Sequence, residues 1–142
     1  KVEIVHPYGS LGRLPWQAHE ASIVEFGAKE GVDLPAVASR IRTYHEEIAD
    51  LTRQEVIEDL FAAAETIVFL GFAYHDQNLA LLRPKNPREN RRVFATAMGF
   101  EPADVSDIQG ALQTTFPYVN TAYVQPVTSA ELFRNHQRVL QR

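Results

Sequence analysis

Residues 66–78 read TIVFLGFAYHDQN, and this stretch decides the expected fold. Its first part, Thr66 to Phe72, is a run of β-branched and large apolar residues without polar alternation. Such a run is typical of a strand that is covered on both faces, as strands of parallel sheets are. In the polar part that follows, Asp76 or Asn78 can cap a short helix through Leu82. The stretch therefore predicts a strand, a loop and a helix in an α/β protein.

The flanking sequence repeats this order of strand, turn and helix. A second apolar strand, Val93 to Ala97, leads through Gly99 into a helix opened by Pro102, whose missing N–H costs nothing in a first turn. Before the deciding stretch, Thr52 and Glu55 form a capping box. The helix that they open should present one apolar face made of Val56, Ile57, Leu60, Phe61 and Ala64.

Other expected elements have weaker signals. They are strands at Val2–Val5, Ile23–Phe26 and Ala122–Val124, a helix opened by Asp33 and Pro35 that runs through Ile41 and Tyr44, and a last helix from Thr128, with a capping box to Glu131 and with Leu132, Phe133, Val139 and Leu140 on one side.

Alternating strands and helices imply right-handed crossovers between parallel strands. We expect Val2–Val5, Ile67–Leu70 and Val93–Ala97 to lie side by side and point the same way. The expected fold is a Rossmann-like, three-layer α/β fold with a small, mostly parallel sheet. Residues 1–142 are expected to form a single domain that is part of a longer protein, because the chain starts at Lys1 and its only methionine is Met98.

Composition excludes several classes of function. An apolar content of 45% is enough for a core, and the absence of cysteine excludes disulfides, thiolate nucleophiles and a zinc ribbon. No apolar run approaches the roughly 20 residues of a membrane span, and a net charge of −4 argues against nucleic acid as a partner. No HExxH, GxSxG or P-loop pattern occurs, so no metal site is expected. These observations fit a cytoplasmic protein.

In open α/β sheets, ligands bind beyond the carboxyl ends of the strands. The loop from His6 to Gly12 follows the first expected strand, and its small residues Gly9 and Ser10 leave backbone N–H groups accessible for a phosphate. A tight turn whose glycines relieve steric strain explains the same residues, and that explanation is favoured because no helix obviously starts at Gly12.

The loop after the second strand, from Gly71 to Asn78, is the strongest candidate for a site. Gly71 would let a ligand approach the backbone, while His75 and Asp76 can hydrogen-bond a ribose or act in proton transfer. The structural alternative makes Asp76 an N-cap and His75 a solvated loop residue.

Five basic residues lie within ten positions, and only Glu89 opposes them. A phosphate or nucleic-acid contact is conceivable, but two prolines and the absence of interleaved aromatic residues favour a solvated loop. The five are Arg83, Lys85, Arg88, Arg91 and Arg92.

Two stretches together resemble the second half of SIR2-like domains. The turn Tyr8-Gly9-Ser10-Leu11-Gly12 is similar to the family's HG-S-L turn, and residues 67–79, IVFLGFAYHDQNL, are similar to its strand of the form "vvviGySfsDpnl". In the family a third strand follows, and here it would be Val93 to Ala97.

The resemblance implies a pocket for NAD or ADP-ribose, with Gly9, Ser10, Gly71, Phe72, Asp76 and Asn78 as cofactor-binding residues. The family's catalytic histidine aligns with Tyr8, so His6, two residues away, and His75 are the candidate catalytic residues. A Thr-Ser pair of the family is replaced by Phe72 and Ala73. An active parent protein would be a bacterial NAD hydrolase rather than a lysine deacetylase, because the cysteine ribbon is absent.

Two hypotheses follow. In the first, this chain supplies half of a nucleotide pocket, and the amino-terminal part of the same protein supplies the other half. In the second, it is a catalytically inactive scaffold or a homo-oligomerisation domain, and the loop glycines are only turn residues. The first predicts an open concavity at the strand ends, whereas plugging by Tyr8, Phe72 and Tyr74 favours the second.

Overall fold

The computed structural model describes residues 5, 31–41, 51–86 and 89–140, with the backbone alone for 51–54. The chain divides into two compact units, Lys1–Gln54 and Glu55–Arg142, and each is described by itself. The expectation of one domain over residues 1–142 stays a prediction. The expected strand Ile23–Phe26 lies outside the described residues, as does Val2–Val5 except for Val5, which belongs to no strand.

In the first unit, helix α1 (Leu34–Ala38) confirms the predicted start but is shorter than expected. The Asp33 carboxylate accepts a hydrogen bond from the backbone N–H of Ala36 at 3.1 Å, as an N-cap residue does. The helix ends at Ser39, so Ile41 is not part of it, and Tyr44 lies outside the described residues.

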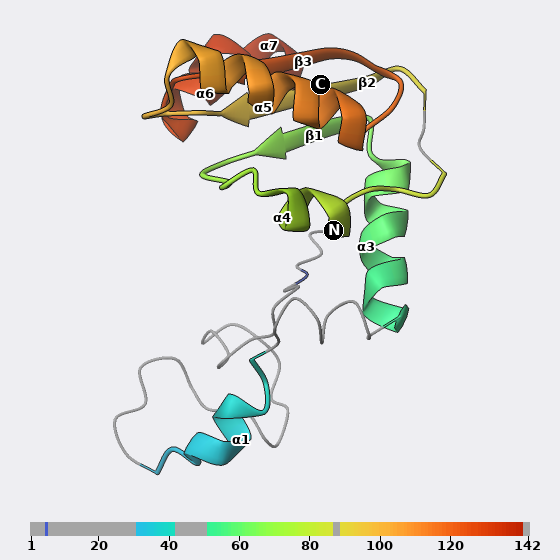
Figure 1. Cartoon of the computed structure of the whole chain (residues 1–142), viewed down its shortest axis with the longest axis vertical. Helices are drawn as coiled ribbons and strands as arrows, with labels where there is room; N and C mark the ends of the chain where they lie inside the picture. Colours follow the sequence, from blue (N-terminus) through green and yellow to red (C-terminus); the bar gives the residue numbers. More distant parts are fainter. Residues whose placement is uncertain (1–4, 6–30, 42–50, 87–88, 141–142) are drawn as a thin grey trace. The chain divides into compact units, whose positions relative to one another are not determined.

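The second unit contains a three-stranded sheet in the order β1 (Thr66–Phe69), β2 (Arg91–Thr96) and β3 (Val119–Gln125). Both pairs are parallel, so the carboxyl ends of all three strands lie at one edge of the sheet. The parallel arrangement of the two apolar strands is confirmed, and Figure 1 shows their arrows pointing the same way. β3 is longer than the expected Ala122–Val124.

The helices of this unit are α3 (Leu51–Ala63), α4 (Asp76–Leu81), α5 (Pro102–Thr115), α6 (Ser129–Asn135) and α7 (Gln137–Leu140). α4 connects β1 to β2, and α5 connects β2 to β3, so each pair of parallel strands is joined by a helical crossover (Figure 1). Pro102 occupies the first turn of α5, as predicted, and Glu101 and Asp104 form a capping box there.

The main core lies between the sheet and helices α4 and α5. Val93 and Ala95 project from one face of β2, where they pack with Leu79 of α4 and Leu112 of α5. Phe116, which follows α5, is fully buried in the same cluster. This hydrophobic layer fixes the two crossover helices on a single face of the sheet.

The opposite face of the sheet is covered by α6. Phe94 of β2 stacks on Tyr123 of β3 with ring centroids 5.0 Å apart, and the His136 ring lies 4.7 Å from Phe94. Leu132 of α6 is fully buried. Helices on both faces of a small parallel sheet make this unit a three-layer, Rossmann-like α/β fold, which confirms the predicted fold class.

Burial differs between the two apolar strands. β2 is buried along almost its whole length, whereas in β1 only Ile67 and Phe69 are buried. β1 is an edge strand of the described sheet and ends at Phe69, three residues before the predicted end. The expectation that this strand is covered on both faces was therefore wrong for β1, although it describes β2 well.

Two helices also differ from prediction. Leu51 is already helical, so Thr52 lies inside α3 rather than capping it. Of the predicted apolar face, Ile57 is buried, and Phe61 and Ala64 pack against the core, whereas Val56 and Leu60 are 40% and 41% exposed.

The predicted final helix is broken in two at His136. Its start is confirmed, because Thr128 and Glu131 make the predicted capping box. Phe133 is 45% exposed, since it lies about 100° around the helix from the buried Leu132. Among the described helices, none has the length and apolar character that a membrane crossing requires.

Candidate functional site

The loop that follows β1 is shaped by Gly71. Gly71 has a φ of +59°, in the left-handed region that glycine adopts without strain. Its backbone N–H donates to Oγ1 of Thr96 at 3.0 Å, which ties this loop to the end of β2. The chain therefore turns soon after β1, within the loop Gly71–Asn78 that the sequence placed between this strand and the next helix.

Tyr74 fixes the second half of this loop. It is only 8% exposed, and its hydroxyl donates a 2.7 Å hydrogen bond to the backbone carbonyl of Thr96. Its ring packs among Phe69, Phe72 and Phe100, with centroids 5.4 to 6.3 Å away. Burial raises the pKa of the phenol to about 12, so the hydroxyl stays protonated near neutral pH. The buried Tyr74 fills the space behind the strand ends.

The polar residues of the loop are placed differently from the prediction. His75, not Asp76 or Asn78, is the N-cap residue of α4, and its side chain makes no capping hydrogen bond. Asp76 is the first residue of the helix, where a negative charge is favourable near the amino end of the helix dipole. His75 and Asp76 are exposed, and Phe72 and Asn78 are half-buried. His75 is therefore accessible, and its imidazole does not cap α4.

A second glycine turn lies beside the first. Gly99 follows β2 with a φ of +87°, and because β1 and β2 are paired through Phe69 and Ala95, the two turns leave neighbouring strand ends. A Cβ atom built on either glycine would meet nothing within 4 Å. Both turns thus present uncovered backbone at the edge of the sheet where α/β proteins bind ligands.

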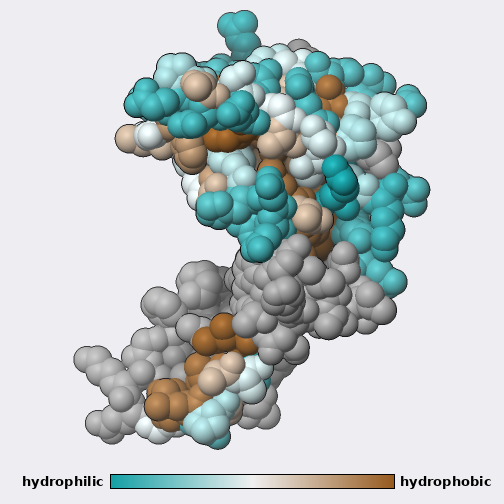
Figure 2. Space-filling model, viewed as in Figure 1, coloured by the Kyte–Doolittle hydropathy of each residue, from teal (hydrophilic) through white to brown (hydrophobic). Residues whose placement is uncertain are grey.

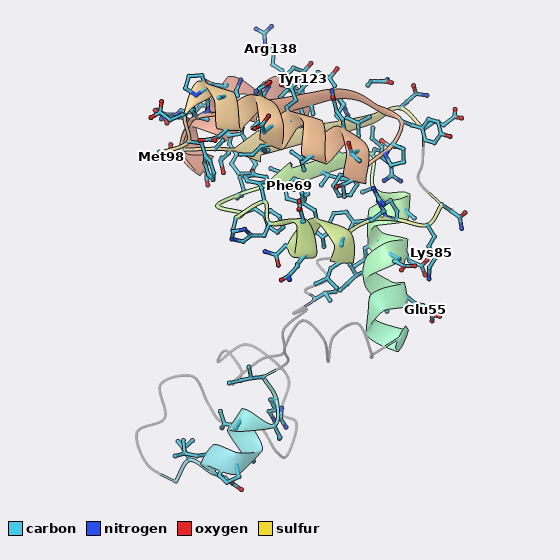
Figure 3. All side chains as sticks on the ribbon, in the orientation of Figure 1. Glu55, Phe69, Lys85, Met98, Tyr123 and Arg138 are labelled. Carbon is cyan, nitrogen blue, oxygen red and sulfur yellow. The ribbon has the colours of Figure 1, made fainter. Side chains whose placement is uncertain are left out.

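Large apolar side chains are exposed at this same edge. Leu70, Met98 and Phe100 are 44%, 67% and 39% exposed, and we call them the strand-end apolar surface. Met98 projects at the end toward which the arrows point (Figure 3), and hydrophobic colouring extends to that end of the unit in Figure 2. The carboxyl edge of the sheet is therefore more apolar than the polar side chains of residues 75–78 alone would indicate.

A groove of about 470 Å³ lies between α4 and α5. α4 and the residues after it contribute Asp76, Leu79, Ala80 and Arg83, and α5 contributes Ala111, Thr114 and Thr115. The sequence predicted Asp76 in the strand-end site, whereas in the structure Asp76 lines this groove. The α5 residues that line the groove could not be identified from the sequence, because no local pattern indicates that α4 and α5 pack side by side.

The basic segment 83–92 is only partly the solvated loop that the sequence favoured, because Arg83 and Lys85 are exposed outside any helix or strand, whereas the segment ends in β2. Arg91 belongs to β2 and is fully buried, and its Nη2 donates to the Ala62 carbonyl of α3 at 2.6 Å. Lys85 lies beside α3 (Figure 3), and its Nζ is 2.9 Å from the Glu58 carboxylate. The hydrogen bond that Lys85 donates to Glu58, and the charge of that carboxylate, raise the pKa of Lys85.

Arg83 donates to the Thr114 carbonyl at 3.2 Å, which gives it a contact in the fold as well. Arg92 lines a surface hollow of about 460 Å³ together with Glu65, Glu89 and Asn90, at the amino ends of the strands. The acidic residues in that hollow argue against a phosphate there. Arg88 lies outside the described residues.

The residues expected in the first loop, His6, Tyr8, Gly9 and Ser10, lie outside the described residues. No group of three or more potential metal ligands occurs within the part of the chain that the structure describes. A scan against protein-family models finds no matching family, and neither a search of curated proteins nor a search of solved structures finds a match.

Proposed function

We propose that this chain supplies part of a binding site for NAD or ADP-ribose, as the carboxyl-terminal half of a SIR2-like domain. The observation that carries this proposal is the pair of uncovered glycine turns, Gly71 and Gly99, at neighbouring strand ends of a parallel sheet. Side chains would hold a ligand away from the backbone, whereas glycines permit close approach. The carboxyl edge is also where doubly wound sheets bind nucleotides.

His75 is the polar side chain of this edge that is best placed for a ligand. It is exposed, it follows the Gly71 turn, and it makes no capping hydrogen bond with α4. An imidazole nitrogen can donate to or accept from a ribose hydroxyl. Tyr74 and Phe72 would act indirectly, because their packing fixes the loop that carries His75.

In an intact parent protein the proposed reaction is hydrolysis of NAD. Water would add to the anomeric carbon of the nicotinamide ribose while the bond to nicotinamide breaks. His6 stays the proposed general base of that step, and His75 the proposed ligand for the ribose.

Calorimetric titration of the chain and of its full-length parent with NAD and with ADP-ribose tests the proposal. We expect heat of binding for the parent, and about a tenfold weaker affinity for His75→Ala, because one hydrogen bond contributes about 1–1.5 kcal/mol. Gln137→Ala removes an exposed polar side chain from α7 and serves as the control. No heat at millimolar concentrations of either ligand would contradict the proposal.

A second function, a scaffold that self-associates, is favoured by a different observation. Tyr74 is buried and fills the space behind the loop. The strand-end apolar surface of Leu70, Met98 and Phe100 is exposed to solvent. Contiguous exposed apolar surface is characteristic of contact sites.

Light scattering separates the two functions. If the strand-end apolar surface joins two copies of the chain, Met98→Glu will convert a dimer into a monomer. Phe133→Glu, which changes an exposed apolar residue of α6, will leave the dimer intact. A monomeric wild-type chain at high concentration would rule out self-association, and nucleotide binding by that monomer would support the first function.

A further inference from the structure

The groove between α4 and α5 carries two opposite charges that do not pair with each other. Asp76 and Arg83 both line it, but they form no ion pair. Within the described residues, the Asp76 carboxylate has no hydrogen-bond partner, and Arg83 donates a single hydrogen bond, to the Thr114 carbonyl at 3.2 Å. An arginine has five N–H donors. Acceptor capacity therefore remains at Asp76, and donor capacity remains at Arg83.

The spacing of these residues separates the charges along the groove. Asp76, Ala80 and Arg83 follow one another at intervals of four and three residues, so they lie along one side of α4 and its continuation. Asp76 is the first residue of α4, and Arg83 follows the C-cap residue Leu82, so the two charged residues lie at opposite ends of the helix. Leu79 and Ala80 of α4 and Ala111 of α5 supply the apolar part of the lining.

Thr115 adds a hydroxyl group to the lining of the groove. It is only 6% exposed, it lines the groove, and its hydroxyl makes no hydrogen bond with any residue that the structure describes. Thr114 beside it also lines the groove, but its hydroxyl donates to the Gly110 carbonyl at 2.9 Å. A hydroxyl in the lining of the groove can donate a hydrogen bond to a ligand oxygen, and such a bond contributes about 0.5–1.5 kcal/mol.

Helix dipoles explain part of this arrangement. Asp76 lies in the first turn of α4, and Arg83 contacts a carbonyl near the end of α5, so each charge is favourable at its helix end. Such effects contribute about 0.3–1 kcal/mol each. They do not account for the hydroxyl of Thr115 or for an open volume of about 470 Å³ beside it.

We propose that this groove binds a small zwitterion whose ammonium and carboxylate groups are joined by a short apolar chain, that is, an ω-amino carboxylate. The ammonium group pairs with Asp76, and the carboxylate accepts hydrogen bonds from Arg83 and Thr115. The methylene chain lies on Leu79, Ala80 and Ala111. This site is separate from the strand-end site, so it stands whether or not the chain binds a nucleotide.

The probe for this site is 6-aminohexanoate, titrated into the chain and followed by calorimetry and by amide chemical shifts. We expect saturable binding, with shifts concentrated at residues 76–83 and 111–115. Hexanoate lacks the ammonium group and hexylamine lacks the carboxylate, so each should bind at least tenfold more weakly, since a charge-assisted hydrogen bond contributes about 1.5–3 kcal/mol. Equal affinity for hexanoate, or no binding of the zwitterion, would overturn the proposal.

Matched substitutions locate the contacts. Thr115→Val keeps the shape of the side chain and removes its hydroxyl, and it should weaken binding about threefold to tenfold, whereas Thr114→Val should leave binding nearly unchanged. Arg83→Gln should weaken binding at least tenfold, and Arg134→Gln on α6 is its control. Asp76→Asn should abolish the preference for 6-aminohexanoate over hexanoate, and Asp107→Asn should not.

Thermal unfolding of each variant is measured alongside the titration. A variant with an unchanged midpoint and weakened binding supports the proposed contact. If the affinity of folded Thr115→Val and Arg83→Gln variants equals that of the wild type, the groove is not the site.

Discussion

Tyr74 and Arg91 stabilise opposite edges of the sheet in the same way. At the carboxyl edge, the Tyr74 hydroxyl donates to the backbone carbonyl of Thr96 at 2.7 Å. At the amino edge, Nη2 of Arg91 donates to the backbone carbonyl of Ala62 at 2.6 Å. In each case a buried polar side chain links two elements that are distant in the sequence.

The two residues nevertheless suggest different roles when only the sequence is read. Tyr74 stands in a stretch that resembles a nucleotide site, and Arg91 stands in a basic run that resembles a solvated loop. Both are structural in the fold, because each is buried and donates a hydrogen bond to a backbone carbonyl of another element. The burial of a polar residue next to a strand must therefore be known before a chemical role is assigned to it.

Removal of the Tyr74 side chain should have the largest effect. Tyr74→Ala leaves a cavity among Phe69, Phe72 and Phe100 and deletes the hydrogen bond to Thr96. We expect a loss of about 3–5 kcal/mol in the free energy of unfolding, measured by urea denaturation. Tyr118→Ala, at a position that is 64% exposed, should cost under about 1 kcal/mol. Equal effects of the two variants would show that Tyr74 does not hold the carboxyl edge.

At the amino edge, Arg91→Met tests the corresponding contact. The variant fills similar space but leaves the Ala62 carbonyl without this donor, so we expect a loss of about 1.5–3 kcal/mol in the same assay. Arg92→Met, at the half-buried neighbouring position, is the control. If Arg91→Met is as stable as the wild type, Arg91 does not stabilise the amino edge in the way that Tyr74 stabilises the carboxyl edge.

The hydroxyl of Tyr74 can be tested apart from its ring. At neutral pH, Tyr74→Phe should cost about 1 kcal/mol, since one hydrogen bond is lost and the packing is kept. The pKa of Tyr74 is raised from 10.0 to about 12 in the folded chain, so its contribution is complete below pH 10 and declines as the pH rises from 10 to 12. The stability difference between wild type and Tyr74→Phe should therefore shrink over that range. A constant difference from pH 8 to 12 would exclude this role for the phenol.

The smallest expected effect concerns Lys85 and its partner. Glu58→Gln removes the main cause of the raised pKa of Lys85, so that pKa should fall toward its ordinary value. Glu55→Gln removes only the weakest of the causes and should lower the pKa less. Titration of the lysine side-chain resonances by NMR measures both, and equal changes in the two variants would contradict the observed ion pair.

Much of the fold could be predicted because it depends on local patterns. The apolar run before Gly71 and the one from Val93 predicted two parallel strands, and the Thr128 capping box predicted the start of α6. The length of β3 was not predictable, because this edge strand mixes polar and apolar residues from Val119 to Gln125. Exposure of Val56 and Leu60 depends on which part of α3 meets the core, and that is a tertiary property.

The candidate site was less predictable than the fold. The turn at Gly71 was correctly placed, because a glycine directly after a strand is a local signal. The N-cap of α4 was wrong by one residue, since His75 takes the position without a capping side chain. The groove was missed because Arg83 and Thr115 come together only when α4 and α5 pack on the same face, and no spacing in the sequence reports that contact.

The strand order β1-β2-β3 follows the order of synthesis, and this has a consequence for how the unit forms. Thr66 pairs with Arg92, and Arg92 pairs with Thr121, so each strand needs only the segment directly after it to gain a neighbour. Pairing with the next strand costs less chain entropy than pairing with a more distant segment would, because the entropy cost of closing a loop grows with its length. The sheet can therefore grow one strand at a time as the chain leaves the ribosome, without waiting for a distant segment.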